Sequence, residues 1–535
     1  MGPGPALKTM ALRRRSLLLG AGAAALTAGC ADEAAGEHWQ AHWVGASHER
    51  GHRLRAADPL AWPAGPPRRA DVLIVGGGVA GLAAARAFMR RGVDDLRLFE
   101  LEDDAGGNSR AHTLGGHACP LGAHYLPLPG PQAREVGEWL FELGLLRHEL
   151  GRTRADERHL VHAPQERLFI DGAWVEGLLP PAEPGTATLA QYRRFAGLVT
   201  EAQQSLGFAL PSFRAPWSAG LAALDAITFA AWLDARSLDD PRLRWTLDYA
   251  CLDDYGAAAD TVSAWAGLHY FASRHGFHVP GDDGEDDGEG LLTWPEGNAW
   301  LTRRLAAPLG DRLLTGRVVL RLREQRHHVD LLAWNVAADR LETWQAETVV
   351  LAVPLMVAAR LVEVPPAPLV AAAGRLRHAP WLVANVLLDA PPLARPGAPP
   401  AWDNVAYGQR ALGYVDAGHQ DLRVDRQPTL LTAYEAWPID RRAALLALDA
   451  GAAARHVLAQ LAVMHPELPH HATTLALMRH GHAMAVPEPG VRGAPALAAL
   501  RGQHGRLRFA HADLAGYSVF EEAFTLGSRV ADPPG

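Results

Sequence analysis

Lysine is nearly absent from this chain of 535 residues. Lys8 is the only one, so arginine supplies almost all of the 51 Lys and Arg residues. Coding DNA of high GC content explains such a bias without any function. The absence still restricts the chemistry, because beyond residue 8 no lysine can act as a base, form a Schiff base or hold a water molecule.

Cysteine is also scarce, with only Cys30, Cys119 and Cys251. Two cysteines in the long segment after residue 30 do not imply a disulfide framework, and we expect both to be buried small side chains. The net charge is −8 and no basic stripe offsets the acidic residues, which excludes a nucleic-acid partner. The 48% hydrophobic content indicates a globular protein long enough for two or three domains or lobes.

The N-terminus lacks a hydrophobic run long enough for a standard transmembrane helix. Residues 17–28 are apolar and follow the arginines at 13–15, but they are too short and too rich in small residues to span a bilayer. This pattern predicts a twin-arginine export signal over residues 1–30, ending in a lipobox-like LTAGC at Cys30. We expect a periplasmic protein tethered to the membrane surface by a lipid on Cys30, with a linker at 31–69. An uncleaved membrane anchor is the alternative.

The most informative stretch is 71–110, in which a strand, a glycine turn, a helix and a second strand follow one another. The turn reads G-x-G-x-x-G, with glycines at Gly76, Gly78 and Gly81. Because glycine has no side chain, the turn can be tight and its backbone N–H groups stay accessible. The N–H groups of the following helix, which starts at Val79 and Ala80, point at any anion that docks there. A pyrophosphate fits this geometry.

The second strand closes with an acid at dinucleotide-binding spacing. Glu100 follows Gly81 by 19 residues and can accept hydrogen bonds from both hydroxyls of an adenosine ribose, so the stretch predicts FAD or NAD. Gly106 and Gly107 then complete an E-x5-GG-x-S-R arrangement that resembles the flavin amine oxidase superfamily, whose usual form is E-x5-GGR. The resemblance favours FAD. It implies further contacts at Ser109 and Arg110, because Asn108 replaces the usual arginine.

Two more parts of the chain resemble cofactor-contacting segments of the same superfamily. PLGAHYLP resembles the segment beside the flavin ring, which implies contacts at Gly122, Ala123 and His124. A strand at 317–322 and the A-x-P turn at 352–354 resemble the middle block, which implies Val319 beside the adenine and Ala352 over the cofactor. By composition alone these two segments would be mere core strands.

The C-terminal block at 506–531 resembles the closing F-A-G-x-[ED] block of the superfamily. Asp513 takes the acid position, which implies a contact with the ribityl and pyrophosphate region. A helix from about Val519 is expected to point its N-terminus at the pyrimidine edge of the flavin. A second dinucleotide block so far from Gly81 favours FAD over NAD. The C-terminal half has no cysteine, which excludes a cysteinyl-flavin bond there, so we expect non-covalent FAD.

The resemblance also implies the fold. We expect an α/β protein, with a Rossmann-like FAD-binding domain of three layers around a parallel sheet and an α+β substrate-binding domain that carries a helical subdomain. The expected segments are 70–130, 291–356 and 491–535 for the FAD-binding domain, and 131–290 and 357–490 for the substrate domain. Apolar residues at helical spacing between 189 and 273 predict the helical subdomain, and Asp171-Gly172 predicts a hairpin turn.

Catalytic residues are harder to place. Many members of the superfamily hold a water near flavin N5 with a lysine, and this chain has Trp381 and Asn385 in that region. The resemblance implies Tyr517 as a substrate-side aromatic, with His482 and His124 as a base or as pocket walls. The H-x-H pattern that ends at His482 is weak evidence for a metal, and we expect none.

The resemblance implies an FAD-dependent oxidoreductase that moves a hydride from a carbon next to an amine of a small-molecule substrate to flavin N5. The reduced flavin would then pass the electrons on to oxygen, a quinone or a carrier protein. Two alternatives stay open. One is an FAD-dependent desaturase or oxidase of an isoprenoid or porphyrin-like substrate, and the other is a non-catalytic flavoprotein tethered to the membrane.

Overall fold

The computed structural model describes residues 38–55, 61–162, 164–279, 290–420, 428–502 and 505–532. The predicted signal at 1–30, with Cys30, lies outside these ranges. Within them, no helix combines the length and apolar character that a membrane crossing requires. The chain divides into a unit at 1–40 and a compact unit at 41–535, to which the elements below belong.

A five-stranded parallel sheet collects its strands from three distant parts of the chain. Its order is β13 (Leu313–Leu314), β4 (Leu96–Phe99), β3 (Val72–Val75), β17 (Thr348–Leu351) and β23 (Leu507–Phe509). Every residue of β3 is buried, because a central strand of a parallel sheet is covered on both faces. The sheet therefore brings the glycine turn after β3 close to segments that lie hundreds of residues further along the chain.

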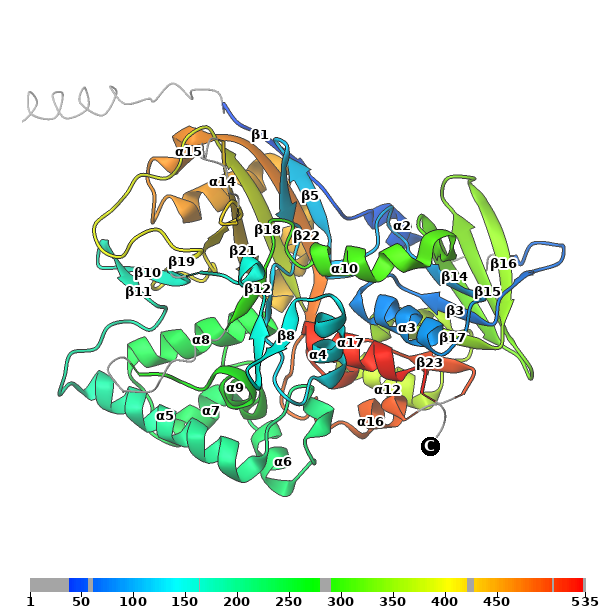
Figure 1. The fold of residues 1–535 in the computed structure, drawn as a ribbon, viewed down its shortest axis with the longest axis horizontal. Helices are drawn as coiled ribbons and strands as arrows, with labels where there is room; N and C mark the ends of the chain where they lie inside the picture. The colour runs from blue at the N-terminus through cyan, green and yellow to red at the C-terminus, as the bar shows by residue number, and fades with distance from the viewer. Residues whose placement is uncertain are drawn as a thin grey trace, which may run out of the picture. The chain divides into compact units, whose positions relative to one another are not determined.

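The two faces of this sheet carry different layers (Figure 1). Alternate residues of β3 point to opposite faces, so that Val72 and Ile74 pack among the helices, and Leu73 and Val75 pack toward a second sheet. The helical layer contains α3 (Val79–Arg90), α10 (Ala299–Ala306) and α17 (Phe520–Arg529), and the second sheet runs β14 (Arg317–Glu324), β15 (Val329–Asn335), β16 (Arg340–Ala346) and β2 (Arg68–Arg69). These three layers confirm the predicted α/β fold class with its Rossmann-like arrangement.

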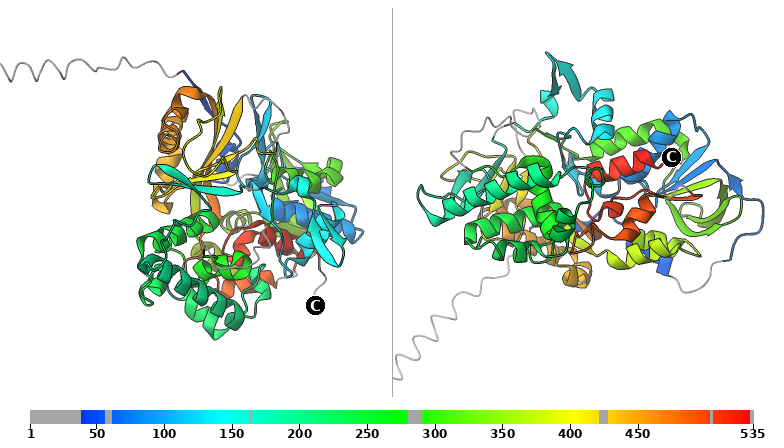
Figure 2. Two further views of the ribbon diagram at one scale, coloured as in Figure 1. Left: turned by 60° about the vertical axis from the view of Figure 1, so that its left-hand side comes forward. Right: turned by 90° about the horizontal axis from the view of Figure 1, so that it is seen from below.

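A larger mixed sheet forms the centre of the other half. Seven of its strands lie in the order β22 (Ala472–Ala485), β18 (His378–Leu388), β21 (Thr429–Ala436), β20 (Tyr414–Asp416), β19 (Asp403–Ala406), β10 (Glu166–Ile170) and β11 (Ala173–Glu176). Asp171 and Gly172 join β10 to β11 with positive φ at both positions, which confirms the predicted two-residue hairpin. Figure 2 shows, in its left view, α14 (Ala450–Leu461) in orange on one side of the yellow strands.

The predicted helical subdomain is confirmed, and it lies below this sheet in Figure 1. Its helices are α5 (Ala187–Leu206), α6 (Ala219–Asp225), α7 (Phe229–Asp234), α8 (Pro241–Tyr255) and α9 (Ala264–Tyr270). Each begins at a Thr, Ser or Asp whose side chain accepts a hydrogen bond from a backbone N–H of the first turn. Their apolar faces enclose a core of aromatic residues that includes Phe195, Phe229 and Trp265.

Candidate cofactor and substrate site

The glycine turn after β3 has two glycines that the protein itself requires and one that it does not. A Cβ on Gly81 would lie 1.8 Å from the carbonyl oxygen of Gly76, and Gly76 has a φ of +104° with Ala352 O 2.4 Å from a Cβ. A Cβ on Gly78 would meet no atom of the described protein nearer than the Cα of Gly107, at 3.9 Å. Open space therefore lies over the Gly78 backbone at the start of α3, where a pyrophosphate would approach.

Glu100 is held in place at the end of β4. Its Oε2 accepts a hydrogen bond from Gly77 N–H (2.7 Å), and its Oε1 accepts one from Glu102 N–H (2.9 Å). Burial raises the pKa of Glu100, and the two backbone N–H groups act against this rise. Each carboxylate oxygen keeps lone-pair capacity for a ribose hydroxyl.

The second glycine pair packs against the first turn. Gly106 N–H donates to Gly77 O (2.8 Å), and a Cβ on Gly107 would lie 3.1 Å from the Cα of Gly78. Ser109 is buried directly behind this turn, where its N–H donates to Gly106 O (2.9 Å). The structure thus places both predicted glycine turns next to the open space over the Gly78 backbone.

Arg110 lies beside this space with its donors turned to protein atoms. Its Nη1 donates to Gly45 O (2.6 Å), its Nε donates to Gly107 O (3.1 Å), and its Nη2 lies 3.9 Å from Glu102. Gly45 belongs to the segment predicted as a linker, part of which therefore packs against the glycine turns. A phosphate contact by Arg110 stays a prediction.

Val319 and Ala352 occupy different positions around the parallel sheet. Val319 is buried on β14 in the same cluster as Phe99 and Trp344. Ala352 N–H donates to Val75 O (2.8 Å), which holds the Ala352 carbonyl against Gly76. Ala352 therefore forms one wall of the glycine turn, whereas Val319 belongs to the buried cluster on the other side of the sheet from α3.

Asp513 is completely buried in the 3-10 helix Ala512–Ala515, and both of its oxygens have partners in the protein. Its Oδ2 accepts from Leu355 N–H (2.8 Å), and its Oδ1 lies 3.0 Å from His378 Nε2 and 3.2 Å from His511 Nδ1. Burial alone would raise the pKa of Asp513, but the two imidazoles hold it well below its usual value. No sequence motif marks His378, a single histidine at the start of a strand. The ribityl contact of Asp513 stays a prediction.

Helix α17 begins one residue after the predicted start, with Val519 as its N-cap. Two buried acids occupy its first turn. Glu521 binds Arg274 through both carboxylate oxygens (3.2 and 3.1 Å), and Glu522 Oε1 accepts from Tyr517 O–H (2.7 Å). These carboxylates stabilise the positive end of the helix.

Tyr517 is fully buried among rings of the helical subdomain, those of Tyr255, Trp265 and His269, at centroid distances of 5.9, 5.8 and 5.3 Å. Burial and the charge of Glu522 raise its pKa well above the usual value, so the hydroxyl is a neutral donor. Among the described residues, no ring contact or hydrogen bond joins any two of the predicted catalytic residues Tyr517, His482 and His124.

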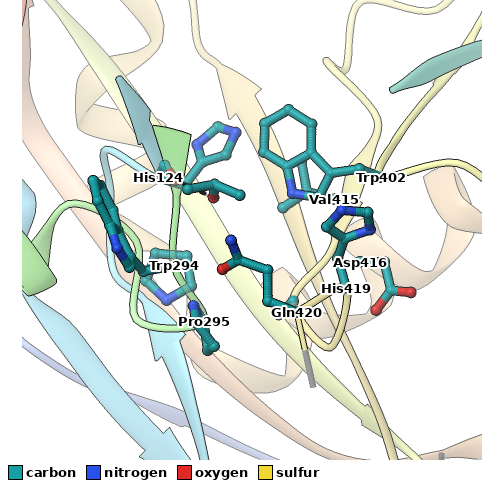
Figure 3. Close-up of a pocket in the computed structure, with 11 residues that line it drawn as sticks. His124, Trp294, Pro295, Trp402, Val415, Asp416, His419 and Gln420 are labelled. Carbon is teal, nitrogen blue, oxygen red and sulfur yellow. Dashed lines mark hydrogen bonds between the residues drawn. The ribbon is translucent and has the colours of Figure 1, made fainter. Parts of the chain in front are cut away.

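His124 stands in an aromatic group next to Gly122. Its ring stacks on Tyr434 at 4.4 Å and lies 5.5 Å from Trp402, while Tyr434 O–H donates to Gly122 O (3.1 Å). Figure 3 shows His124 and Trp402 lining a small cavity that Trp294 and Gln420 also border. Burial lowers the pKa of His124 to about 3, so its imidazole is neutral at physiological pH.

His482 lies on β22, away from this aromatic group. Its ring centroid is 6.1 Å from that of His378, and burial and Arg442 lower its pKa to about 4. Its neighbour His480 binds Leu121 O through Nε2 (2.7 Å), which makes His480 a structural contact. Across the described residues, no group of three or more His, Cys, Asp or Glu side chains is arranged to hold a metal ion.

Carboxylates that the sequence analysis missed lie beside the His124 group. Tyr125 O–H donates to Asp253 Oδ2 (3.2 Å), and the charges of Asp253, Asp403 and Glu166 act on one another. Burial and the charge of Asp254 raise the pKa of Asp253 to about 7, and burial and Glu166 raise that of Asp403 well above its usual value. We call this group, Tyr125, Asp253, Asp403 and Glu166, the acidic cluster. Its acids are far apart in sequence, so no motif could have revealed it.

Two curated relatives match parts of the chain. A protein of Mycobacterium tuberculosis named as a flavin-containing monoamine oxidase is 28% identical over 301 residues, which is 54% of this chain and 58% of that protein. The coproporphyrinogen III oxidase of Mycobacterium leprae is 35% identical over 131 residues, which is 24% of this chain and 26% of that protein. The chain thus spans less than two thirds of the length of either relative.

Solved structures agree on the fold. A putrescine oxidase bound to putrescine superposes with a TM-score of 0.65 at 21% identity, over 87% of this chain and 99% of that one. At this identity the likeness establishes the fold alone. The model of the family described as flavin containing amine oxidoreductase matches residues 79–532. The chain therefore belongs to the flavin containing amine oxidoreductase family, which confirms FAD as its cofactor.

Proposed function

We propose that this protein is an FAD-dependent oxidoreductase that removes a hydride from a carbon next to an amine nitrogen and delivers it to flavin N5. FAD supplies the electron-accepting ring. The chain would supply its position, because the uncovered backbone at Gly78 would receive the pyrophosphate and Glu100 would hold the ribose.

The acidic cluster beside His124 is the observation that supports an amine substrate. Burial, and then acids of this cluster, raise the pKa of Tyr249 and of Tyr270. The raised pKa values of Asp253 and Asp403 favour their protonated forms in the empty site, and a bound ammonium ion would favour the carboxylates, while tyrosine faces attract it. The charge of Arg274 also acts on Asp253, but Arg274 already pairs with Asp254 (3.4 Å) and Glu521 (3.1 Å). The cluster therefore gains negative charge most readily when a cation binds, which supports a cationic substrate.

The pKa values of the acids and histidines at the site also indicate which of them can accept a proton. An ammonium group must lose its proton before its carbon gives up a hydride. Asp253, with a pKa of about 7, can accept that proton at a carboxylate oxygen near neutral pH. His124 and His482, with pKa values of about 3 and 4, are weak bases, and His124 borders the small cavity.

Oxidation of a porphyrinogen is the second candidate, and the M. leprae relative favours it. Coproporphyrinogen carries several carboxylates, and among Asp253, Asp403 and Glu166 these would meet acids in place of a countercharge. The acidic cluster thus favours an amine over this substrate.

We also propose that the protein is exported by the twin-arginine route and tethered through a lipid on Cys30. The arginines at 13–15 and the LTAGC sequence support this location. At a membrane surface, quinone, a carrier protein or oxygen could each receive the electrons. Membrane fractionation of the full chain and of its Cys30→Ala variant tests the lipid tether. If the tether exists, the substitution moves the protein to the soluble fraction. An unchanged distribution contradicts the tether.

Anaerobic reduction of the holoenzyme tests the reaction. The flavin spectrum is recorded while putrescine, benzylamine, an amino acid or an isoprenoid is added. Bleaching by amines alone supports the proposal, whereas bleaching by the isoprenoid or by a porphyrinogen in place of amines supports the second candidate. A yellow protein that no donor reduces would indicate a non-catalytic flavoprotein.

A further inference from the structure

A second, larger cavity of about 580 Å³ adjoins the small cavity beside His124, and the two share Pro295, Asp416, Ala417 and Gln420. Tyr414 and Val415 are consecutive residues of β20, so their side chains point to opposite faces; Val415 borders the small cavity beside His124, and Tyr414 borders the large one. The volume is within the range of pockets that hold small organic ligands.

Three polar residues form a row across the floor of this cavity. The register pairs Arg167 of β10 with Asn404 of β19, and Asn404 with Tyr414 of β20. Arg167 Nε donates to Asn404 Oδ1 (2.6 Å), and its Nη1 lies 3.3 Å from Ala398 O. The row therefore presents one guanidinium, fixed by neutral partners, to the cavity.

Arg167 is 5% exposed and has no carboxylate partner in the part of the chain that the structure describes. Its guanidinium stacks on Trp174, 3.9 Å from the ring centroid, and burial lowers its pKa, against a rise from Tyr414. The buried Arg274 differs, because it pairs with both Asp254 and Glu521. A buried cation without a counterion is costly, and an anion in the cavity would offset that cost.

Of the other titratable groups around Arg167, His465 is neutral and Glu467 is already paired, whereas Asp416 is an acid at the edge of the cavity. Tyr414 O–H lies 2.8 Å from His465 Nε2, and burial lowers the pKa of His465 to about 4, so this imidazole is a neutral acceptor. Glu467 binds Arg395 Nη2 (2.8 Å) and Leu393 N–H (3.0 Å). Asp416 stands where the large cavity meets the small one, and its Oδ1 accepts from Gly418 N–H.

We propose that this cavity binds a small amphipathic anion, with its anionic group on Arg167 and its apolar body among the residues Pro391, Pro392, Leu393, Leu430 and Leu431. These apolar side chains border the same cavity as the polar row. The guanidinium offers a planar fork of N–H donors, which suits a carboxylate or a phosphate. The argument for this ligand site uses neither the flavin reaction nor the amine substrate.

Calorimetric titration of the FAD-loaded enzyme with sodium octanoate tests the site. We expect one octanoate to bind per chain. 1-Octanol lacks the anionic group and inorganic phosphate lacks the apolar body, so each should bind about tenfold or more weakly than octanoate. Arg167→Gln should weaken octanoate binding about tenfold or more, as expected for a lost charge-assisted hydrogen bond. Arg158→Gln is the matched control, since the side chain of Arg158 is 83% exposed.

Three results would overturn the proposal: no binding of octanoate to the folded holoenzyme, equal binding by Arg167→Gln, or phosphate binding as tightly as octanoate. Flavin absorbance and circular dichroism establish that each variant is folded. If Arg167→Gln does not fold, Leu393→Asp replaces it, because Leu393 is 60% exposed and borders the cavity. The added negative charge should weaken octanoate binding, and unchanged binding would contradict the site.

Discussion

The imidazole of His378 lies 3.0 Å from the carboxylate of Asp513, and both residues are buried. His378 begins β18 of the large sheet, whereas Asp513 follows β23 of the parallel sheet. Arg442 Nη2 donates to His378 O (2.6 Å), and Asp513 accepts from Leu355 N–H. This contact therefore joins the two sheets at the level of the cofactor-binding turns.

Breaking that contact should destabilise the fold. His378→Phe leaves the buried Asp513 carboxylate without one of its partners, which costs roughly 3–5 kcal/mol of unfolding free energy. Chemical denaturation of the holoenzyme measures the loss. Adding Asp513→Asn in a double-mutant cycle should recover part of it, and strictly additive losses would show that the pair does not interact.

The same pair predicts the response to acid. The folded pKa of Asp513 is lowered, so its contribution to stability is complete above the unfolded pKa of about 3.9 and is lost as the pH falls through the folded value. Unfolding free energy should thus fall more steeply below pH 4 in the native protein than in Asp513→Asn. Parallel curves for the two proteins would contradict the assignment.

The glycine turn offers a matched pair of substitutions. Gly78→Ala adds a Cβ that meets no described protein atom within 3.9 Å, so the chain should fold while FAD binding weakens. Gly81→Ala places a Cβ 1.8 Å from Gly76 O and should prevent the turn from forming. Flavin content and circular dichroism separate these outcomes, and full FAD retention in folded Gly78→Ala would place the pyrophosphate elsewhere.

Glu100 should be needed for cofactor retention. In Glu100→Gln the amide NH2 would face one of the two backbone N–H groups that now donate to the carboxylate, so the ribose partner would turn away. We expect FAD to bind about tenfold or more weakly, as for a hydrogen bond to a charged group. Fluorescence titration of the apoprotein measures this, with the exposed Glu157→Gln as control.

The pKa of Asp253 predicts how amine binding depends on pH. Its pKa of about 7 means that the carboxylate gains its charge between pH 6 and pH 8, so a cationic diamine such as putrescine should bind more tightly at pH 8. Anaerobic titration of the flavin spectrum at both pH values measures the change. Asp253→Asn should remove it, and a variant with the same pH dependence would exclude Asp253 as the titrating group.

The sequence by itself determined the glycine turn and the acid that are expected to bind the cofactor. Gly76, Gly78, Gly81 and Glu100 lie within one strand, turn, helix and strand, and their geometry follows from local backbone rules. The hairpin at Asp171-Gly172 was predictable for the same reason, because tight turns depend on neighbouring residues. The distant Asp513 block needed family resemblance, since nothing local relates it to Gly81.

Only the tertiary structure decided the substrate side. Three separate elements carry the acids Asp253, Asp403 and Glu166. Tertiary packing places these acids close enough for their charges to act on one another. Burial then sets their pKa values, as it does for His124, and no sequence pattern encodes burial. The same applies to Arg167, an ordinary arginine in the sequence, which became a candidate anion site only when the sheet register placed it at a cavity without a counterion.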